Sequence, residues 1–418
     1  MSKNYAEFYK CALQVNPYSY IKYRGQEHEM TEEQYNESIY NYCIKNNISI
    51  IGLADHGNVD KSKKLREYLS SKGILVFPGF EISTSEKIHI VCLFSENTEE
   101  QELERYLGEL GLSNPEDGNS PSTMSFHDIT QRVIDRGGFW YAAHITSDNG
   151  VLKGKHNNLW KSDKLVAAQI PSKKNEVNPN YINILKNKDP NYQKKTPFAL
   201  INAKDVSKPE DLDLDTASCL IKMSKLNFES FKLAFRDPKA RVKLNFDINN
   251  KYPHSSINEI KISMGYLDNL SLDLSPNLNT IIGGRGAGKS TFIELIRYAL
   301  DINPMSRNAN TSFENICKSN LGIGGIVELV VTSHAQYGKQ FKIIKRYNED
   351  PIIKDINNNV SSYTVKDILP NIEVYSQNEI IDLTTDENAK LKILNRFLNR
   401  NDNNDEKKEE IKSNLQSN

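Results

Sequence analysis

The order of apolar and polar residues divides the chain into two regions with different periodicities. From about residue 49 to residue 201, short apolar stretches alternate with amphipathic ones, a pattern typical of strands alternating with helices. Further along, residues 260–262 and 270–274 alternate apolar and polar side chains with period two, which predicts strands with one buried face. We therefore predict an α/β protein with domains at residues 1–243 and 244–400 and a polar tail at residues 401–418.

Individual elements can be placed within the first region. Thr31 and Gln34 form a capping-box pattern that predicts the start of a helix ending near residue 46. An apolar strand is predicted directly after it, at residues 48–53. Further strands are predicted at residues 74–77, 88–94 and 139–143.

Ionisable side chains recur at or near the ends of these strands. They are Asp55, His56, Glu81, His89 and His144. In parallel β/α folds the carboxyl ends of the strands meet at one face, where catalytic groups gather. The recurrence favours a functional cluster, although any one of these residues taken alone is better explained as an ordinary polar loop residue.

The strongest functional indication is the sequence GGRGAGKST at residues 283–291. It follows an apolar segment, residues 278–282, that predicts a strand, and it precedes a helix predicted to begin at about Ser290. Glycines at this spacing let successive backbone N–H groups curl around phosphates without interference from Cβ atoms. Lys289 is then expected to meet the β and γ phosphates of ATP, and Ser290 to bind Mg²⁺. The predicted nucleotide-binding residues are Gly283, Gly284, Arg285, Gly286, Ala287, Gly288, Lys289, Ser290 and Thr291, the last of them more a helix residue than a ligand.

Beyond this loop, two apolar stretches at residues 326–331 and 341–347 flank a turn around Tyr337 and predict an antiparallel hairpin. A further strand is predicted at residues 372–375. The polar tail is expected to be either disordered or the start of a coiled coil.

Composition limits the classes of protein to which this chain can belong. The chain of 418 residues has 53 Lys and Arg against 54 Asp and Glu, so no global basic field points to nucleic acid, although a local basic patch stays open. Its five cysteines are scattered singly, which fits a reducing compartment. The sequence shows no signal peptide and no apolar run long enough to span a membrane, and we expect a cytoplasmic protein.

The second half resembles the amino-terminal lobe of SMC/RecF-like ATPases of the ABC class. The resemblance lies in NLNTIIGGRGAGKSTFIELI at residues 277–296, like their Walker A segment, and in IEVYSQNEI at residues 372–380, like their Q-loop. Arg285 stands where that family usually has Asn. The resemblance implies that Gln377 is the catalytic residue that senses the attacking water, and that Ser290 and Gln377 share the Mg²⁺ bound with ATP.

The first half resembles the PHP (polymerase and histidinol phosphatase) domain, a distorted β/α barrel that holds up to three metals. IIGLADHGNVD at residues 50–60, VFPGFEIST at residues 76–84 and GGFWYAAHI at residues 137–145 carry the resemblance. It implies metal-ligand positions at Asp55, His56, Glu81, His89 and His144.

Other ligand positions of the PHP pattern are changed. Gln14 and Asn16 stand where the family has His-x-His, and the closing Asp-x-His is replaced by Ala203, Lys204 and Asp205. Neutral amides bind divalent cations far more weakly than imidazole or carboxylate does. We expect a degenerate site that holds one Mn or Zn ion or none.

The order of the two halves, joined by residues 218–242, resembles the fused PHP–ATPase proteins called TrlF-like. Neither an LSGGQ-like signature nor a Walker B pair follows Gln377, since Asp386 and Glu387 end a stretch interrupted by polar residues. ATP hydrolysis is therefore expected only with a complementary lobe, on the same or another polypeptide, in an ATP-dependent homo-oligomer.

The leading hypothesis is an ATP-binding module of a bacterial nucleic-acid-processing or phage-defence system, with the PHP-like barrel as a platform or sensor. The alternative is a metal-dependent PHP phosphoesterase or nuclease that is gated by ATP. A third interpretation is an inert remnant of a truncated gene.

Overall fold

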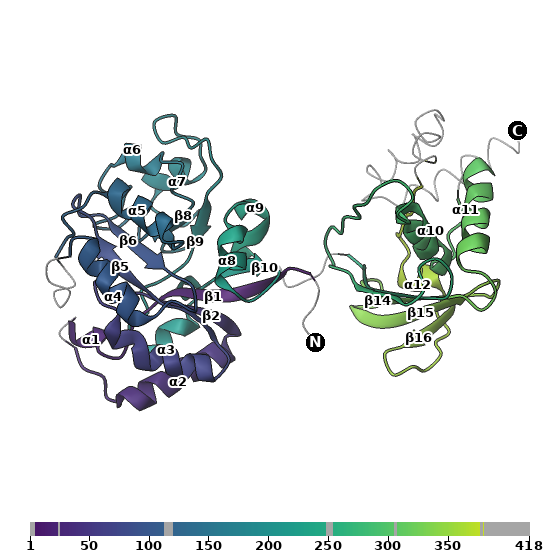
Figure 1. The fold of residues 1–418 in the computed structure, drawn as a ribbon, viewed down its shortest axis with the longest axis horizontal. Helices are drawn as coiled ribbons and strands as arrows, with labels where there is room; N and C mark the ends of the chain where they lie inside the picture. The colour runs from purple at the N-terminus through teal and green to yellow at the C-terminus, as the bar shows by residue number, and fades with distance from the viewer. Residues whose placement is uncertain are drawn as a thin grey trace, which may run out of the picture. The chain divides into compact units, whose positions relative to one another are not determined.

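The computed structural model describes residues 5–23, 26–112, 120–247, 254–304, 307–376 and residue 379. The chain forms two compact units, an amino-terminal unit of residues 6–250 and a carboxy-terminal unit of residues 251–418, to which residues 1–5 also belong (Figure 1). The division lies a few residues beyond the boundary expected from the sequence, because β11 (Val242–Leu244) still pairs with β10 (Cys219–Met223).

The amino-terminal unit is an α/β structure with two mixed sheets. The first has the order β11, β10, β1 (Glu7–Val15), β2 (Ile48–Leu53) and β4 (Leu75–Phe77). The second has the order β3 (Asp55–His56), β5 (Gly79–Ser83), β6 (His89–Leu93), β7 (Phe139–Ala142), β8 (Ala167–Gln169) and β9 (Ala199–Ile201). The α/β class is as predicted, but the described strands form two separate sheets and do not close into one barrel.

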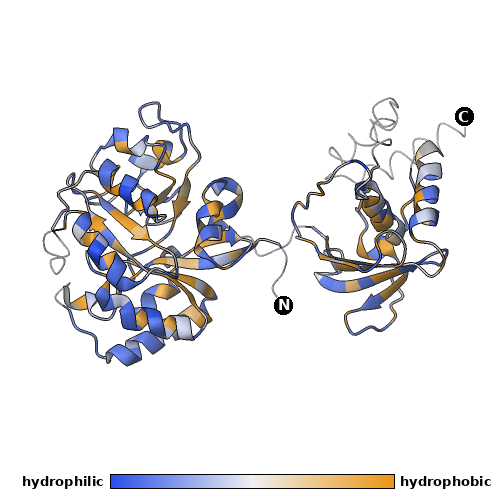
Figure 2. Cartoon of the chain, viewed as in Figure 1, coloured by the Kyte–Doolittle hydropathy of each residue, from blue (hydrophilic) through white to orange (hydrophobic). Residues whose placement is uncertain are grey.

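The two sheets share a core. One buried apolar cluster takes side chains from both of them, among them Leu13, Ile50, Val91, Tyr141 and Ile201. Successive side chains in a strand point to opposite faces, and both faces of β2 are covered. Ile50 joins the cluster between the sheets, whereas Ile51 packs under α2 and α3. The orange apolar residues of the sheets in Figure 2 therefore lie inside the unit.

Helices cover the outer faces of these sheets. The capping box predicted for α2 (Glu32–Lys45) is confirmed, because the Gln34 N–H donates to Thr31 Oγ1 at 3.3 Å and the Thr31 N–H donates to Gln34 Oε1 at 2.9 Å. The other described α-helices are α1 (Tyr20–Tyr23), α3 (Lys63–Ser71), α4 (Glu100–Glu109), α5 (Phe126–Asp135), α6 (Asn157–Trp160), α7 (Pro179–Leu185), α8 (Phe228–Ala234) and α9 (Pro238–Arg241). Short 3-10 turns lie at η1 (Asp60–Ser62), η2 (Pro209–Asp213), η3 (Asp215–Ala217) and η4 (Asn245–Asp247).

The carboxy-terminal unit is a five-stranded antiparallel sheet with helices on one face (Figure 1). Its strand order is β13 (Leu270–Asp273), β12 (Ser256–Ser263), β14 (Ile326–Ser333), β15 (Lys339–Arg346) and β16 (Ile352–Asp355). The helices are α10 (Lys289–Ala299), α11 (Arg307–Asn320) and α12 (Val365–Ile368). The predicted hairpin of β14 and β15 is confirmed, and alternate residues of β14 are buried against α10.

Two predicted strands are wrong. Residues 278–282 and 372–375 have no strand ladder in the described part of the chain. A strand needs a neighbour to pair its backbone groups, and residues 278–282 pair with none of the described strands. Leu278 and Ile282 are 86% and 92% exposed. Gln377, the residues around Asp386 and the tail at 401–418 lie outside the described residues.

The five cysteines are buried and carry free thiols. Within the described residues, no helix combines the length and the apolar character needed to span a bilayer.

Candidate functional site

The amino-terminal unit brings the predicted ionisable residues together at neighbouring strands of its second sheet. The parallel pairing of β3 with β5 sets His56 opposite Glu81, and the antiparallel pairing of β5 with β6 sets His89 opposite Ser83. His144 follows the end of β7, the next strand in the same sheet. Sheet pairing therefore explains why residues far apart in sequence converge.

The carboxylate of Glu81 is the centre of this cluster and is only 2% exposed. His89 Nδ1 lies 2.6 Å from Glu81 Oε1, and His144 Nε2 lies 3.4 Å from the same oxygen. His56 Nε2 lies 3.5 Å from Glu81 Oε2, which also accepts a hydrogen bond from the amide of Gln14. One buried carboxylate thus has three imidazoles and one amide around it.

Burial and these contacts change the ionisation of the cluster. Burial alone would raise the pKa of Glu81, but the three surrounding imidazoles hold that pKa well below its usual range. Burial also acts to lower the pKa of His144, yet the contact with Glu81 reverses the direction and raises it. Asp55, buried beside the cluster, has its pKa raised to about 6 by the loss of water.

A second carboxylate, Asp205, belongs to the same region, although the sequence analysis counted it among the changed ligand positions of the PHP pattern. Asn16 donates its side-chain amide to one oxygen of Asp205, and the Tyr20 hydroxyl donates to the other at 2.7 Å. The ring of Tyr20 stacks on His56 with ring centroids 5.1 Å apart. Lys204, which precedes Asp205, is paired with Asp211 at 2.6 Å.

Strand pairing brings Asp205, the last residue of the changed closing motif, to this region. Val15 at the end of β1 forms a parallel bridge with Val206, and the Val206 N–H donates to the Gln14 carbonyl at 3.0 Å. These bonds carry Asp205 to the end of β1, next to Asn16. The motif position alone did not predict this contact between Asp205 and Asn16.

His144 has an unusual backbone conformation. Its φ of 25° lies in the left-handed region, which residues other than glycine rarely adopt. Its backbone N–H donates to Gln169 Oε1 at 2.8 Å, which fixes the turn. Backbone strain of this kind is often found where a side chain is aimed at a functional site.

The cluster fits one metal ion. Ligand atoms of His56, Glu81 and His89 all lie within 4.8 Å of one another, and imidazole with carboxylate is a donor set suited to zinc or manganese. Buried polar atoms without a hydrogen-bond partner lie nearby: Gln14 Oε1, Asn16 Oδ1 and His144 Nδ1. Buried polar atoms are usually satisfied, so such orphans suit a site that takes a further ligand.

In the carboxy-terminal unit, the glycine-rich loop adopts a conformation that only glycine accepts easily. Gly286 and Gly288 have φ values of 80° and 84°, and Gly288 caps the amino end of α10. The ammonium of Lys289 donates to the carbonyls of Gly283 at 2.7 Å and Gly284 at 2.6 Å. The lysine therefore folds back over the loop that precedes it.

A cavity of about 270 Å³ opens beside this loop. It is lined by Tyr266, Gly286, Ala287, Gly288, Lys289, Ser290, Thr291 and Asn320. The first-turn N–H groups of a helix have no carbonyl partner within the helix, and the helix dipole favours anions there. Tyr266 supports the loop, because its hydroxyl donates to the Gly286 carbonyl at 3.2 Å. Residues 286–291 of the predicted nucleotide-binding set thus line a hollow whose chemistry suits phosphate, whereas Gly283, Gly284 and Arg285 do not line it.

Comparison with known proteins finds a family match in this part of the chain. Residues 256–418 match the AAA domain family. An uncharacterized protein of Streptococcus pneumoniae serotype 4 is 28% identical over 123 residues, which cover 27% of this chain. The chain spans 45% of the length of that relative.

Three solved structures resemble the chain weakly. PsfC from Pseudomonas syringae has a TM-score of 0.33 at 12% identity, covering 52% of this chain and 82% of its own. Endonuclease Q, bound to a duplex with an abasic lesion, has a TM-score of 0.39 at 10% identity, and the match covers 60% of this chain and 63% of the endonuclease. A lesion-specific endonuclease from Pyrococcus furiosus has a TM-score of 0.41 at 9% identity, and the match covers 75% of this chain and 83% of that endonuclease. Scores this low assign neither a fold nor a function to this chain.

A second cavity of the AAA domain, of about 480 Å³, joins the loop to the segment before Gln377. Lys289 and Ser290 line it from one side, and Tyr375 and Ser376 from another. Gln377 itself lies outside the described residues. Arg285, at the tip of the loop, is exposed.

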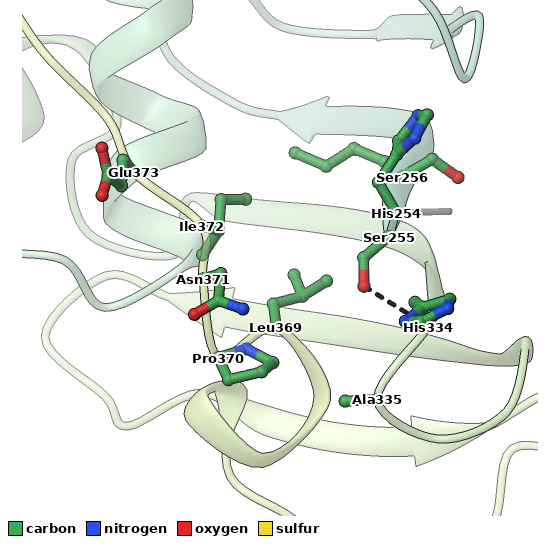
Figure 3. Close-up of a pocket in the computed structure, with 11 residues that line it drawn as sticks. His254, Ser255, Ser256, His334, Ala335, Leu369, Pro370, Asn371, Ile372 and Glu373 are labelled. Atoms are coloured by element: carbon green, nitrogen blue, oxygen red, sulfur yellow. Dashed lines mark hydrogen bonds between the residues drawn. The ribbon is translucent and has the colours of Figure 1, made fainter. Parts of the chain in front are cut away.

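A third hollow of the AAA domain, of about 460 Å³, lies between the start of β12 and residues 369–373. Figure 3 shows His254, Ser255 and His334 at one side of it and Glu373 at the other, with Ser255 Oγ accepting a hydrogen bond from the His334 N–H at 2.9 Å. His254 Nε2 lies 2.9 Å from the Pro276 carbonyl. The two histidines that line this hollow, His254 and His334, do not form a metal-ligand group among the described residues. No sequence motif predicted this hollow.

Proposed function

We propose that the AAA domain binds ATP through residues 283–291. The observation that carries this proposal is the conformation of the loop, with left-handed glycines at 286 and 288 leading into the amino end of α10 beside a cavity that Lys289 lines. Backbone N–H groups of the loop and of the first helical turn would hold the phosphates. Lys289 would leave the carbonyls of Gly283 and Gly284 for the β and γ phosphates.

Magnesium is the expected partner of the nucleotide. Ser290 lies at the first turn of α10, where its hydroxyl would bind the ion, and Gln377 is proposed as the second ligand and as the catalytic residue. The direct test is calorimetric titration of the chain with MgATP. Lys289→Ala should weaken binding strongly, whereas Lys366→Ala on the exposed surface of α12 should not; equal affinity in all three proteins would contradict the proposal.

We propose further that a second ATPase lobe completes the active site and that ATP drives pairing of two such modules. Support comes from the exposed apolar residues Leu278 and Ile282, which precede the loop without a neighbouring strand in the described chain. An exposed apolar segment that joins no ladder with the described strands is suited to association with another strand. We place this assembly in cytoplasmic nucleic-acid processing or phage defence in bacteria, a role that rests on the Walker A and Q-loop resemblance and on the incomplete metal-ligand set of the amino-terminal unit. Co-expression of the chain with a candidate lobe from the same genome, followed by an ATPase assay, tests the assembly.

For the amino-terminal unit we propose a degenerate PHP-like domain with a structural or sensing role, in which His56, Glu81 and His89 hold a single manganese or zinc ion. Neutral Gln14 and Asn16 occupy positions where a full multi-metal centre needs stronger ligands. Metal analysis of the purified chain tests the single site: one equivalent is expected, and three would contradict it.

A metal-dependent phosphoesterase or nuclease is the second candidate function. It is favoured by the carboxylates of Asp55 and Asp205 beside the histidine cluster, because additional anionic ligands are what such chemistry requires. A Mn²⁺-supported phosphodiester assay separates the two candidates. Activity that is lost in Glu81→Ala would favour the hydrolase.

A further inference from the structure

The outer face of the first sheet in the amino-terminal unit is covered by helices over only part of its width. The helices α2 and α3 pack over β2 and β4, where Ile51 and Leu69 share one apolar cluster (Figure 1). On β10, the residues of this face are half-buried and alternate with core residues such as Ile221. Phe8 of β1 lies on the same face and belongs to none of the apolar clusters of the described residues. The apolar packing over β2 and β4 therefore does not extend to Phe8.

Three cations gather around the ring of Phe8. Lys222 lies opposite Phe8 in the antiparallel pair of β1 and β10, and its ammonium is 5.7 Å from the ring centroid. Lys243 of β11 lies opposite Leu220 on the same face, and its ammonium is 4.9 Å from that centroid. Burial lowers the pKa of Lys222, and the charges of Arg241, directly before β11, and of Lys243 lower it further. Three positive charges thus act on one another at this place.

These cations have no carboxylate to balance them. Within the described part of the chain, neither lysine and not Arg241 forms an ion pair. Glu229, from the same segment of sequence, is paired instead with Lys232 at 2.8 Å. Like charges that lie side by side on a sheet lower its stability. An anionic ligand on this face would relieve that repulsion.

The basic character is local to this segment. Residues 222–243 contain seven Lys and Arg against two acidic residues, whereas the whole chain has 53 against 54. Positive charge concentrated on one face is the electrostatic feature of nucleic-acid-binding proteins. An aromatic ring among the cations favours a single strand, because its bases are free to stack on such a ring while a duplex keeps its base faces stacked inside.

We propose that the basic sheet face, formed by Phe8, Lys222, Arg241 and Lys243, binds single-stranded nucleic acid. The three cations contact phosphates, and the ring of Phe8 contacts a base. This inference goes beyond the nucleotide and metal sites proposed above, and it requires neither ATP nor metal.

The test is titration of a fluorescent single-stranded oligonucleotide with the full chain, followed by anisotropy in EDTA and without ATP at several salt concentrations. In Lys222→Gln with Lys243→Gln, affinity at low salt should fall about tenfold, and the slope of log K against log salt should become shallower by about 1.4, because each phosphate contact to a single strand contributes about 0.7. Arg241→Gln, which changes a residue outside the sheet strands, should make the slope shallower by about 0.7. A slope unchanged in both variants would overturn the inference.

The matched control is Lys63→Gln with Lys72→Gln, which removes the same charge from α3. This helix packs over β4, at the opposite edge of the sheet from β11. Lys72 also lies beside an aromatic ring, with its ammonium 5.6 Å from the centroid of Tyr68. The control should keep its affinity within about twofold of wild type, since it leaves the proposed contacts in place. An equal loss in the two double variants would show a general effect of net charge and overturn the inference.

Phe8→Leu separates the ring from the charges. It should weaken binding about fivefold or more through the lost stacking, without changing the salt slope. Unchanged affinity would overturn the role given to the ring.

Two further ligands test the choice of a single strand. A duplex of the same sequence should bind more weakly, and polyglutamate of equal charge should not displace the oligonucleotide. Tighter binding of the duplex, or displacement by polyglutamate, would overturn the assignment to single-stranded nucleic acid. A chain that fails to bind ATP or metal can still give the expected result here, so failure of the functions proposed above is distinguished from failure of this inference.

Discussion

Gln14 donates its side-chain amide to Glu81, the carboxylate that three histidines surround. The amide N–H thus contacts an oxygen that a metal would otherwise use. The neutral amide of Gln14, which presents its N–H to the carboxylate, stands where the PHP pattern has a histidine that can bind metal. This single contact explains in atomic terms why we propose a degenerate site.

Gln14→His should therefore raise metal affinity. An imidazole at this position offers a nitrogen ligand beside His56, Glu81 and His89, and we expect about a tenfold lower Kd for Zn²⁺ or Mn²⁺. Calorimetric titration with each metal measures the effect. Gln131→His on α5 adds a histidine away from the cluster and should leave the Kd unchanged; an equal gain in both variants would show that the added histidine acts nonspecifically.

Gly288→Ala should abolish nucleotide binding. Gly288 has a φ of 84°, and a Cβ atom there would lie 2.9 Å from Tyr266 Cε1, so the loop must shift. Gly338→Ala is the control, because Gly338 has a φ of 81° in the β14–β15 turn with open space around it. Both changes carry a backbone cost of about 1–2 kcal/mol, but only Gly288→Ala should lose affinity for MgATP. Retained affinity in Gly288→Ala would contradict the proposed phosphate site.

The amino-terminal unit should become more stable as pH rises above 8. Lys194 is buried, its ammonium donates to the carbonyls of Trp160 and Ser162, and burial lowers its pKa from 10.5 to about 8. Between these two values the unfolded chain holds a proton that the folded chain has released. The free energy of unfolding therefore rises with pH there, by up to about 3 kcal/mol.

Urea unfolding at pH 7.5 and pH 10 measures this effect by tryptophan fluorescence. Both tryptophans, Trp140 and Trp160, are buried in the amino-terminal unit, so the signal reports on that unit. Other groups titrate in this range, so the effect of the lysine is measured as the difference in the free energy of unfolding between the wild type and Lys194→Met. If this difference is the same at pH 7.5 and pH 10, the pKa of Lys194 is not lowered.

Ile282→Asp should leave the AAA domain folded. Because its side chain is 92% exposed, the change should alter the free energy of unfolding by no more than about 0.5 kcal/mol. The same change should abolish association with a second lobe, since a carboxylate would have to be buried there. Thermal unfolding and co-purification with a candidate lobe measure the two effects. A large loss of stability would mean that residue 282 belongs to the core of this domain.

Local patterns predicted much of the fold. The capping box at Thr31, the strand at residues 48–53 and the β14–β15 hairpin follow from side chains close in sequence, and the structure contains all of them. The strand predicted at residues 278–282 is absent for the opposite reason. Its apolar composition is suited to a strand, but strand formation depends on a neighbour, which local composition cannot supply.

The candidate sites likewise divide into features set by residues close in sequence and features set by pairing between distant residues. Glycine spacing predicted the loop at residues 283–291. The positive φ values of Gly286 and Gly288 explain why glycine is needed at these two positions. The contact between Asp205 and Asn16 could not be found in this way, because it depends on a bridge between residues about 190 positions apart.

The histidine and carboxylate cluster draws its members from distant parts of the amino-terminal unit, from Gln14 in β1 to Asp205 beside the Val206 bridge. A fragment that begins after residue 14 or ends before residue 205 cannot contain the whole set. The proposed ligands His56, Glu81 and His89 come from β3, β5 and β6, so zinc or manganese uptake would also report that these three strands have paired.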